Sequence, residues 1–269
     1  MKRLIFGVLA SILSVFALSA ANLHDMRASN SIKIGVLNNH APFSKDENGT
    51  FSGFEIDLAK EIADYIFHGK EHTLEFVSLA PNERVAALDE NRVDLLLALM
   101  PITDNSKPLV DFSTPYLRIN TAIVTKPGEV FEGCKKLGDK KIALQEKMIA
   151  KDWLYFQGCS DKNFMIVNSF KECYLSLTKG EVEICMGDTI SMMSHSLLES
   201  VNIENQVVGP RNFIAAAVKK GNITLLMAVN NAILALTKDG FFKESSIAIF
   251  DPFFYETVDM NKEELYHFK

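Results

Sequence analysis

Hydrophobic and polar positions along this chain follow two alternating periods, which predict helices and strands in turn. Phe54, Leu58, Ile62 and Ile66 recur every four residues and would form one apolar helix face. The nearly continuous apolar run 93–100 is typical of a strand covered on both faces. This alternation predicts parallel sheets with helices on both sides.

The same alternation extends along the chain in two cycles, without a Gly-, Pro- or Ser-rich linker or a repeat between them. The expected strands or extended segments are 32–37, 74–79, 93–100, 119–125, 141–144, 164–167, 182–186, 206–208 and 213–218. One helix is expected to begin at residue 53. Further helices are expected at 84–88, 150–156, 170–177, 191–198 and 225–237. Two such cycles suit two lobes joined by crossing strands.

The first 21 residues have the three parts of a secretory signal. Lys2 and Arg3 form the basic start, residues 4–18 the apolar middle, and Ser19-Ala20-Ala21 the small-residue end. The apolar middle is shorter than the roughly 20 residues that a membrane-spanning helix needs. We therefore expect export to the periplasm, with cleavage of the signal or its retention as an anchor both left open.

Charge and cysteine content exclude some functions. The net charge of −6 argues against nucleic-acid binding, because phosphates need a basic surface. Cys134 and Cys159 each precede a predicted parallel strand of one region, so we expect a disulfide between them. For Cys173 and Cys185, a second bridge and two buried thiols are both open. The cysteines lack the short spacing of a metal site, and no metal or cofactor is expected.

Several segments, taken in order, resemble one known family. They are Gly-Phe-Glu-Ile-Asp-Leu at 53–58, the strand and "IT" turn at 92–103, Phe-Ser-Thr-Pro-Tyr at 112–116, the strand ending in an acid at 180–188, and Thr-Lys-Asp-Gly-Phe at 237–241. Together they are similar to the family 3 extracellular solute-binding proteins of the amino-acid ABC transporter type. The resemblance spans about residues 33–250.

The resemblance implies an α/β fold of the periplasmic-binding-protein type. Each lobe would be a mainly parallel sheet flanked by helices, and two crossing strands would join the lobes. Lobe 1 would contain residues 22–124 and 210–269, and lobe 2 residues 125–209. The implied function is the substrate-binding component of an ABC importer, in which closure of the lobes traps a small solute. The implied partners are that solute and a permease in the inner membrane, and the chain is expected to be a monomer.

The family's devices for an α-carboxylate are missing here. Members that bind an α-amino acid place an arginine three residues after the "IT" threonine, but Ser106 follows Thr103 at that spacing. Pro101 replaces a hydroxyl residue, and Glu146-Lys147-Met148-Ile149 replaces a Gly-[ST]-[TS] turn. We therefore expect that the ligand is not an ordinary α-amino acid bound in the usual pose. Lys147 or Arg118 would be the replacement cation for an anionic ligand.

Eight residues make up the expected ligand site. They are His40, Phe43, Met100, Ser106, Arg118, Lys147, Met148 and Asp188. Asp188 matches the residue that pairs with a ligand ammonium, and its alternative role is to cap the helix from Thr189. His40 matches an aromatic that stacks on the ligand, or else is an exposed loop residue. Phe43 either lines the site or supports its turn from the core, and Met100 offers an adaptable apolar wall.

Two other classes of function stay open. A few relatives are dehydratases of cyclohexadienyl acids, and Glu146 or Asp188 would be the general acid in such an enzyme. However, the sequence contains no nucleophile–base pair, metal-ligand cluster or glycine-rich phosphate loop, so we expect a binding protein rather than an enzyme. A ligand sensor that presents its closed lobes to a membrane receptor is the third class. The sequence does not identify the ligand.

Overall fold

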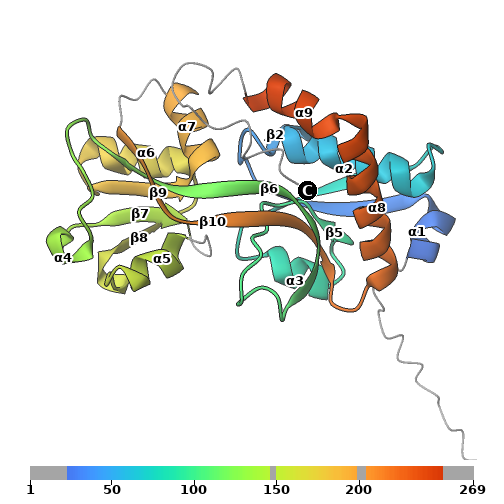
Figure 1. The fold of residues 1–269 in the computed structure, drawn as a ribbon, viewed down its shortest axis with the longest axis horizontal. Helices are drawn as coiled ribbons and strands as arrows, with labels where there is room; N and C mark the ends of the chain where they lie inside the picture. The colour runs from blue at the N-terminus through green and yellow to red at the C-terminus, as the bar shows by residue number, and fades with distance from the viewer. Residues whose placement is uncertain (1–22, 146–149, 199–203, 251–269) are drawn as a thin grey trace, which may run out of the picture.

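The chain folds into two α/β lobes that lie side by side and are joined by two long strands (Figure 1). The computed structural model describes residues 23–145, 150–198 and 204–250. The predicted signal segment lies outside these residues. The crossing strands are β6 (Val110–Thr125) and β10 (Glu204–Lys219).

Lobe 1 contains α1 (Leu23–Ser29), β1 (Ser31–Leu37), β2 (Lys45–Glu47), β3 (Thr50–Ser52), α2 (Phe54–Phe67), β4 (Thr73–Leu79), α3 (Arg84–Asp89), β5 (Leu95–Leu96), α8 (Ile223–Asp239), α9 (Phe241–Ser245) and a π-helical turn, Ser246–Phe250. Lobe 2 contains α4 (Cys134–Leu137), β7 (Ile142–Gln145), α5 (Ala150–Phe156), a 3-10 turn (Asp161–Asn163), β8 (Phe164–Val167), α6 (Phe170–Lys179), β9 (Ile184–Asp188) and α7 (Thr189–Leu198). The short elements α1, β2, β3, α4 and α9 were not predicted.

One eight-stranded sheet runs through both lobes in the order β4-β1-β5-β10-β6-β9-β7-β8. Pairing is parallel within each lobe, where β1 lies between β4 and β5 and β7 between β8 and β9. It is antiparallel where the crossing strands meet each other and their neighbours. The predicted fold class is therefore confirmed.

The crossing strands are longer than the sequence pattern predicted, and their pairing contains a bulge. The predicted segments 206–208 and 213–218 belong to one strand, β10, and β6 begins nine residues before 119. Val208 pairs with Thr121, and Asn212 pairs with Ile119. Four steps along β10 therefore correspond to two along β6, which places an irregular stretch of β10 at the junction of the lobes.

Helix α2 anchors the loop that follows β1. Gly53, just before α2, has φ 119° and ψ 172°, a conformation that favours glycine. The first N–H groups of the helix, on Phe54 and Glu55, donate to the carbonyls of Pro42 and Phe43 at 3.0 and 2.9 Å. N–H groups at the start of a helix have no partner within the helix. Gly53 has no side chain that could cap them, so the loop carbonyls accept their hydrogen bonds instead.

The prediction of a strand over 93–100 was wrong in extent, because β5 contains only Leu95 and Leu96. Leu99 has φ +44°, a left-handed backbone that turns the chain out of the strand direction. Pro101 follows and has no N–H to donate to a sheet. The apolar residues of this run are still buried, as its composition indicated, and only Asp94 is partly exposed.

The hydrophobic core is divided unequally between the lobes. A single large cluster fills lobe 1 and includes Leu225, Val229 and Ile233 of α8, so the last long helix packs in lobe 1. Lobe 2 has two smaller clusters, one on each side of its sheet. The boundaries near residues 124 and 210 stay a prediction.

Both disulfides lie in lobe 2. The expected bridge between Cys134 and Cys159 is confirmed, and its cysteines belong to one of the small clusters. A second bridge joins Cys173 on α6 to Cys185 on β9, and both residues are fully buried. The open alternative of two buried thiols is therefore not what the structure shows.

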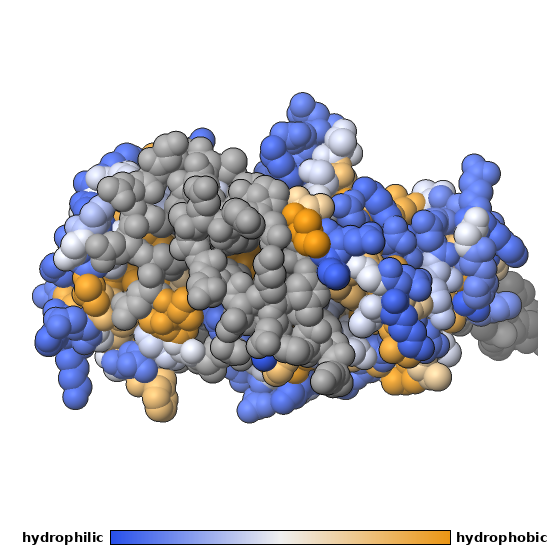
Figure 2. Space-filling model, turned by 45° about the horizontal axis from the view of Figure 1, so that its top comes forward, coloured by the Kyte–Doolittle hydropathy of each residue, from blue (hydrophilic) through white to orange (hydrophobic). Residues whose placement is uncertain are grey.

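The surface carries mostly hydrophilic side chains on the lobe 1 end of the face in Figure 2, with smaller hydrophobic patches elsewhere. Large exposed apolar side chains include Phe156, Ile166 and Leu175 of lobe 2. None of the helices in the described ranges combines the length and apolar character needed to cross a bilayer.

Candidate functional site between the lobes

Two residues predicted for the ligand site meet across the two lobes. His40 follows β1 in lobe 1, and Asp188 ends β9 in lobe 2. The His40 Nε2 atom lies 3.3 Å from Asp188 Oδ2, and each side chain is 3% exposed. The carboxyl ends of strands from both lobes therefore face each other here, which is where open α/β sheets bind ligands. We call this region the inter-lobe site.

The structure bears out one of the two roles expected for Asp188, the helix cap, and its role toward a ligand stays a prediction. Its Oδ1 atom accepts the Ser191 backbone N–H at 2.8 Å, which caps the start of α7. Its Oδ2 atom faces His40 of the other lobe. Burial, followed by the charge of Asp188, raises the pKa of Tyr174, whose hydroxyl donates to the Met192 carbonyl at 2.5 Å.

Aromatic rings surround His40. The ring centroid of Phe170, at the start of α6, lies 5.0 Å from that of His40, and the ring of Phe43 lies at 6.4 Å. Phe43 is fully buried in the lobe 1 core, in agreement with a supporting role for its turn. His40 is 2% exposed rather than an exposed loop residue. Phe170 was not predicted for the site, although Gly187 beside Asp188 was a signal: a Cβ there would lie 2.3 Å from the Phe170 ring.

Glu55 and Arg84 hold the backbone of Leu99 from inside lobe 1. The Leu99 N–H donates to Glu55 Oε1 at 2.7 Å, and Arg84 Nη1 donates to the carbonyls of Ala98 and Leu99 at 2.9 Å each. The hydroxyl of Tyr116, on the crossing strand β6, also donates to Glu55 Oε1. Two buried charged side chains thus maintain the left-handed Leu99.

The segment after Leu99 connects this network to the other crossing strand. The Met100 carbonyl accepts the Ala215 N–H at 3.1 Å, and the Ile102 N–H donates to the Phe213 carbonyl at 2.9 Å. Met100 itself is 4% exposed and packs in the lobe 1 core. Glu55 was not predicted for the site, because sequence spacing does not show what lies opposite a buried carboxylate.

Burial is the largest cause of the pKa shifts in this network. It raises the pKa of Glu55 above 4.5, although the hydrogen bonds from Tyr116 and Leu99 and the charges of His40 and Arg84 lower it in part. Burial also lowers the pKa of Arg84 to about 10. A folded state that binds the Glu55 proton more tightly than the unfolded state loses stability as pH rises from 4.5 through the raised pKa.

We therefore expect that Glu55→Gln removes part of the pH dependence of stability. Glutamine keeps the acceptor oxygen but cannot ionise, so the variant should lack a slope of up to about 1.4 kcal/mol per pH unit above pH 4.5. Urea unfolding of both proteins from pH 4 to pH 8 measures this. The control is Asp57→Asn, a half-exposed carboxylate in the same helical turn. Equal slopes in wild type and Glu55→Gln would contradict the assignment.

Ser106 does not offer its side chain to the inter-lobe site. It is 7% exposed, and its hydroxyl donates to the Pro101 carbonyl at 2.8 Å and accepts the Thr103 N–H at 2.9 Å. These bonds close the turn in which family members place an arginine. Lys107, the neighbouring cation, pairs with Asp104 at 3.0 Å and is more than half exposed.

Arg118 lies on crossing strand β6, three residues before Thr121, the pairing partner of Asp188. Its Nε atom is buried and has no hydrogen-bond partner in the described part of the chain. Side-chain oxygens of Gln145, Ser191 and Ser194 are also buried without a hydrogen-bond partner in the described part of the chain. Gln145 ends β7, and the serines belong to α7, which begins after Asp188. Lys147 and Met148 lie outside the described residues.

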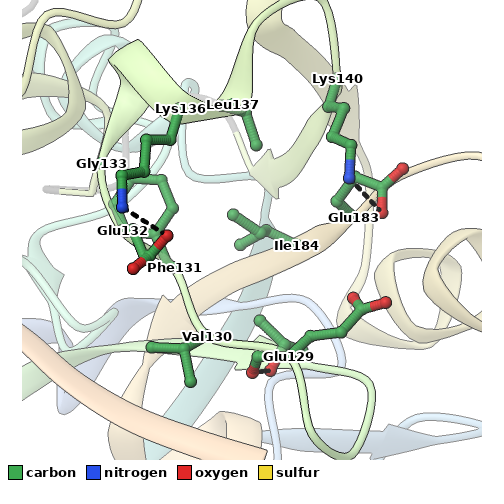
Figure 3. A pocket seen from close by; sticks show the side chains of 11 residues that line it. Glu129, Val130, Phe131, Glu132, Gly133, Lys136, Leu137, Lys140, Glu183 and Ile184 are labelled. Atoms are coloured by element: carbon green, nitrogen blue, oxygen red, sulfur yellow. Dashed lines mark hydrogen bonds and ion pairs between the residues drawn. The ribbon is translucent and has the colours of Figure 1, made fainter.

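A separate pocket of about 290 Å³ lies at the amino end of β9, away from the inter-lobe site (Figure 3). Its floor includes Leu137 and Ile184, and its rim carries two ion pairs. Glu132 pairs with Lys136 at 2.8 Å, and Glu183 pairs with Lys140 at 3.6 Å. These charges are mostly exposed and each pair is neutral, and the hydroxyl of the buried lining residue Thr125 already donates to the Glu129 carbonyl.

Comparison with known proteins gives a consistent result. The family "Bacterial extracellular solute-binding proteins, family 3" matches residues 32–251. The L-cystine-binding protein TcyJ of Escherichia coli K12 is 28% identical over 89% of this chain and 91% of its own length. The ABC transporter arginine-binding protein 1 of the same organism is 26% identical over 91% of this chain and 98% of its own length.

Solved structures agree with the sequence relatives. A solute receptor for L-cysteine from Neisseria gonorrhoeae superimposes with a TM-score of 0.80 at 27% identity, over 89% of this chain and 98% of the receptor. The two sequence relatives described above are binding proteins. With its two lobes, crossing strands and inter-lobe residues, this chain belongs to family 3 of the bacterial extracellular solute-binding proteins, the substrate-binding components of ABC importers.

Proposed function

We propose that this protein is the periplasmic component of an ABC importer for a small polar or amino-acid-like solute, which it traps by closure of the two lobes. The observation that supports this most is the meeting of His40 and Asp188 at 3.3 Å from opposite lobes. A solute shifts an open–closed equilibrium only if it binds the closed form more tightly, which requires contacts from both lobes. The inter-lobe site provides them.

The charges of the site suit a solute with an anionic group bound by Arg118. Asp188 is opposite Thr121, three residues from Arg118, which corresponds to about 10 Å along a strand. The Ser106 hydroxyl is already used within its own turn, so the carboxylate would not be held in the usual corner.

The remaining parts of the proposal concern location and partners. We place the protein in the periplasm after export by its N-terminal signal, as a monomer that delivers solute to a permease. A dehydratase is the less favoured alternative, because the sequence relatives named above are binding proteins. A sensing role would use the same closure and differ only in the membrane partner.

A solute screen tests the proposal. Cystine, cysteine and arginine come first, because relatives bind them, followed by amines and aromatic acids. Thermal shift would detect binding, and small-angle X-ray scattering would detect closure. We expect at least one solute to raise the melting temperature and reduce the radius of gyration. Stabilisation without any compaction would contradict trapping, and an aromatic product formed from arogenate or prephenate would favour the enzyme.

We expect that Arg118→Gln weakens binding of the identified solute, if that solute carries a carboxylate, by tens- to thousands-fold. Loss of one partner of a buried charge pair costs about 2–5 kcal/mol, and about 1.4 kcal/mol corresponds to a tenfold change. Isothermal titration calorimetry measures the dissociation constant. Lys107→Gln is the matched control, since it removes an exposed charge next to the usual arginine position. A larger loss for Lys107→Gln than for Arg118→Gln would overturn the assignment.

A further inference from the structure

His40 contacts Asp188 Oδ2, the carboxylate oxygen with which a solute ammonium would pair. The His40 Nε2 atom lies 3.3 Å from Asp188 Oδ2, and in the tautomer that carries its proton on Nε2 it donates to this carboxylate oxygen. The other oxygen, Oδ1, already accepts the Ser191 N–H at 2.8 Å. Both oxygens of Asp188 therefore have a donor from within the chain.

The position of His40 is fixed by its surroundings. Its carbonyl accepts the N–H groups of Phe43 and Ser44 at 3.0 and 3.1 Å, which closes the turn around the imidazole. The Ser44 hydroxyl donates to the Leu37 carbonyl at 2.6 Å and attaches this turn to the end of β1. On the opposite side, the Phe170 ring of lobe 2 lies 5.0 Å from the imidazole. The ring is thus held between the two lobes.

We propose that His40 is a specificity-determining residue that excludes primary ammonium groups from Asp188. This inference rests on the proposed function. A solute with a free ammonium would have to displace the imidazole N–H from a buried carboxylate, and would leave a buried donor without its partner. A solute whose nitrogen is acylated or absent at this end would meet no such competition. The favoured class is therefore N-acylated or deaminated amino-acid-like solutes, including small peptides with a blocked amino end.

The experiment compares matched solutes rather than searching for the natural one. The probes are L-arginine and L-glutamine, each paired with its N-acetyl derivative, and titration calorimetry at pH 7 measures the affinity ratio within each pair. His40→Phe removes the donor and keeps an aromatic ring. His40→Gln is the matched control, because its amide can still donate to Asp188.

We expect His40→Phe to shift the affinity ratio toward the free amino acid by at least tenfold relative to wild type, and His40→Gln to shift it little. Asp188→Asn in the His40→Phe background should remove the gain. An unchanged ratio in His40→Phe, including no measurable binding of either free amino acid, would overturn the inference. His40→Ala repeats the test if circular dichroism shows that His40→Phe is not folded. Failure of the proposed function would look different: in the solute screen, the wild-type protein would not become more compact with any solute.

Discussion

Reduction of both disulfides should lower the free energy of unfolding of lobe 2 by about 6 kcal/mol. The two bridges close loops with sequence separations of 25 and 12 residues. In the chain-entropy account, loops of these lengths each stabilise a protein by about 3 kcal/mol. The effect should be concentrated in lobe 2, whose two small hydrophobic clusters include all four cysteines.

Trp153 offers a local measurement of this loss. It is the only tryptophan of the chain, and it packs against one of the lobe 2 clusters with its ring centroid 6.2 Å from that of Phe131. Urea unfolding followed by tryptophan fluorescence, with and without dithiothreitol, should show an early transition in the reduced protein only. Circular dichroism would follow the whole chain.

Two paired variants separate the contributions of the bridges. Replacement of Cys134 and Cys159 by serine should cost about as much as replacement of Cys173 and Cys185, and the combination should approach the effect of reduction. A thiol count of zero in the native protein and four after reduction establishes the starting state. An unchanged fluorescence midpoint after complete reduction would show that the bridges do not stabilise lobe 2.

Gly53→Ala should be the most damaging small substitution near the inter-lobe site. A Cβ there would lie 2.5 Å from the Phe43 carbonyl oxygen and 2.8 Å from that of Pro42, and both are backbone atoms. The backbone conformation, φ 119° and ψ 172°, adds strain for any residue with a side chain. We expect a loss of stability of about 3 kcal/mol.

The same substitution should weaken solute binding, because the loop that would have to move carries His40. Gly49→Ala is the matched control: Gly49 also has positive φ, +86°, but no atom lies within 4 Å of its Cβ position. The control should cost about 1 kcal/mol and leave binding unchanged. Denaturant unfolding and calorimetry on both variants measure the two effects. Equal losses in the two variants would show that the contact with the loop carbonyls is unimportant.

Much of the fold could be predicted because most of its elements have a clear period. Helix α2 and strand β1 are within one residue of their expected starts. The strand over 93–100 failed for a tertiary reason, since Glu55 and Arg84 hold Leu99 in a conformation that leucine rarely adopts. No local pattern contains that information.

The site could be predicted only one residue at a time. The position of Asp188 at a strand end indicated two roles, of which the structure shows the helix cap, while its second oxygen faces His40 and its contact with a ligand stays a prediction. Phe170 and Glu55 were missed because their importance depends on neighbours more than a hundred residues away or in another element. Hydrophobic periodicity identifies the buried face of an element but does not identify the element opposite. The altered carboxylate-binding corner stays a prediction, and the structure adds that the Ser106 side chain binds its own turn.

The irregular pairing between β6 and β10 has a mechanical consequence. Across the junction the two strands have unequal contour lengths, because β10 contains two additional residues there. Rotation of one lobe against the other can be absorbed by torsion at Gly209, which has φ +72° and lies beside the indole ring of Trp153. β6, whose path across the junction is the shorter one, would then act as the axis of this rotation. The lobes would then rotate about β6, and the indole ring of Trp153 would lie beside Gly209, where the backbone torsion changes.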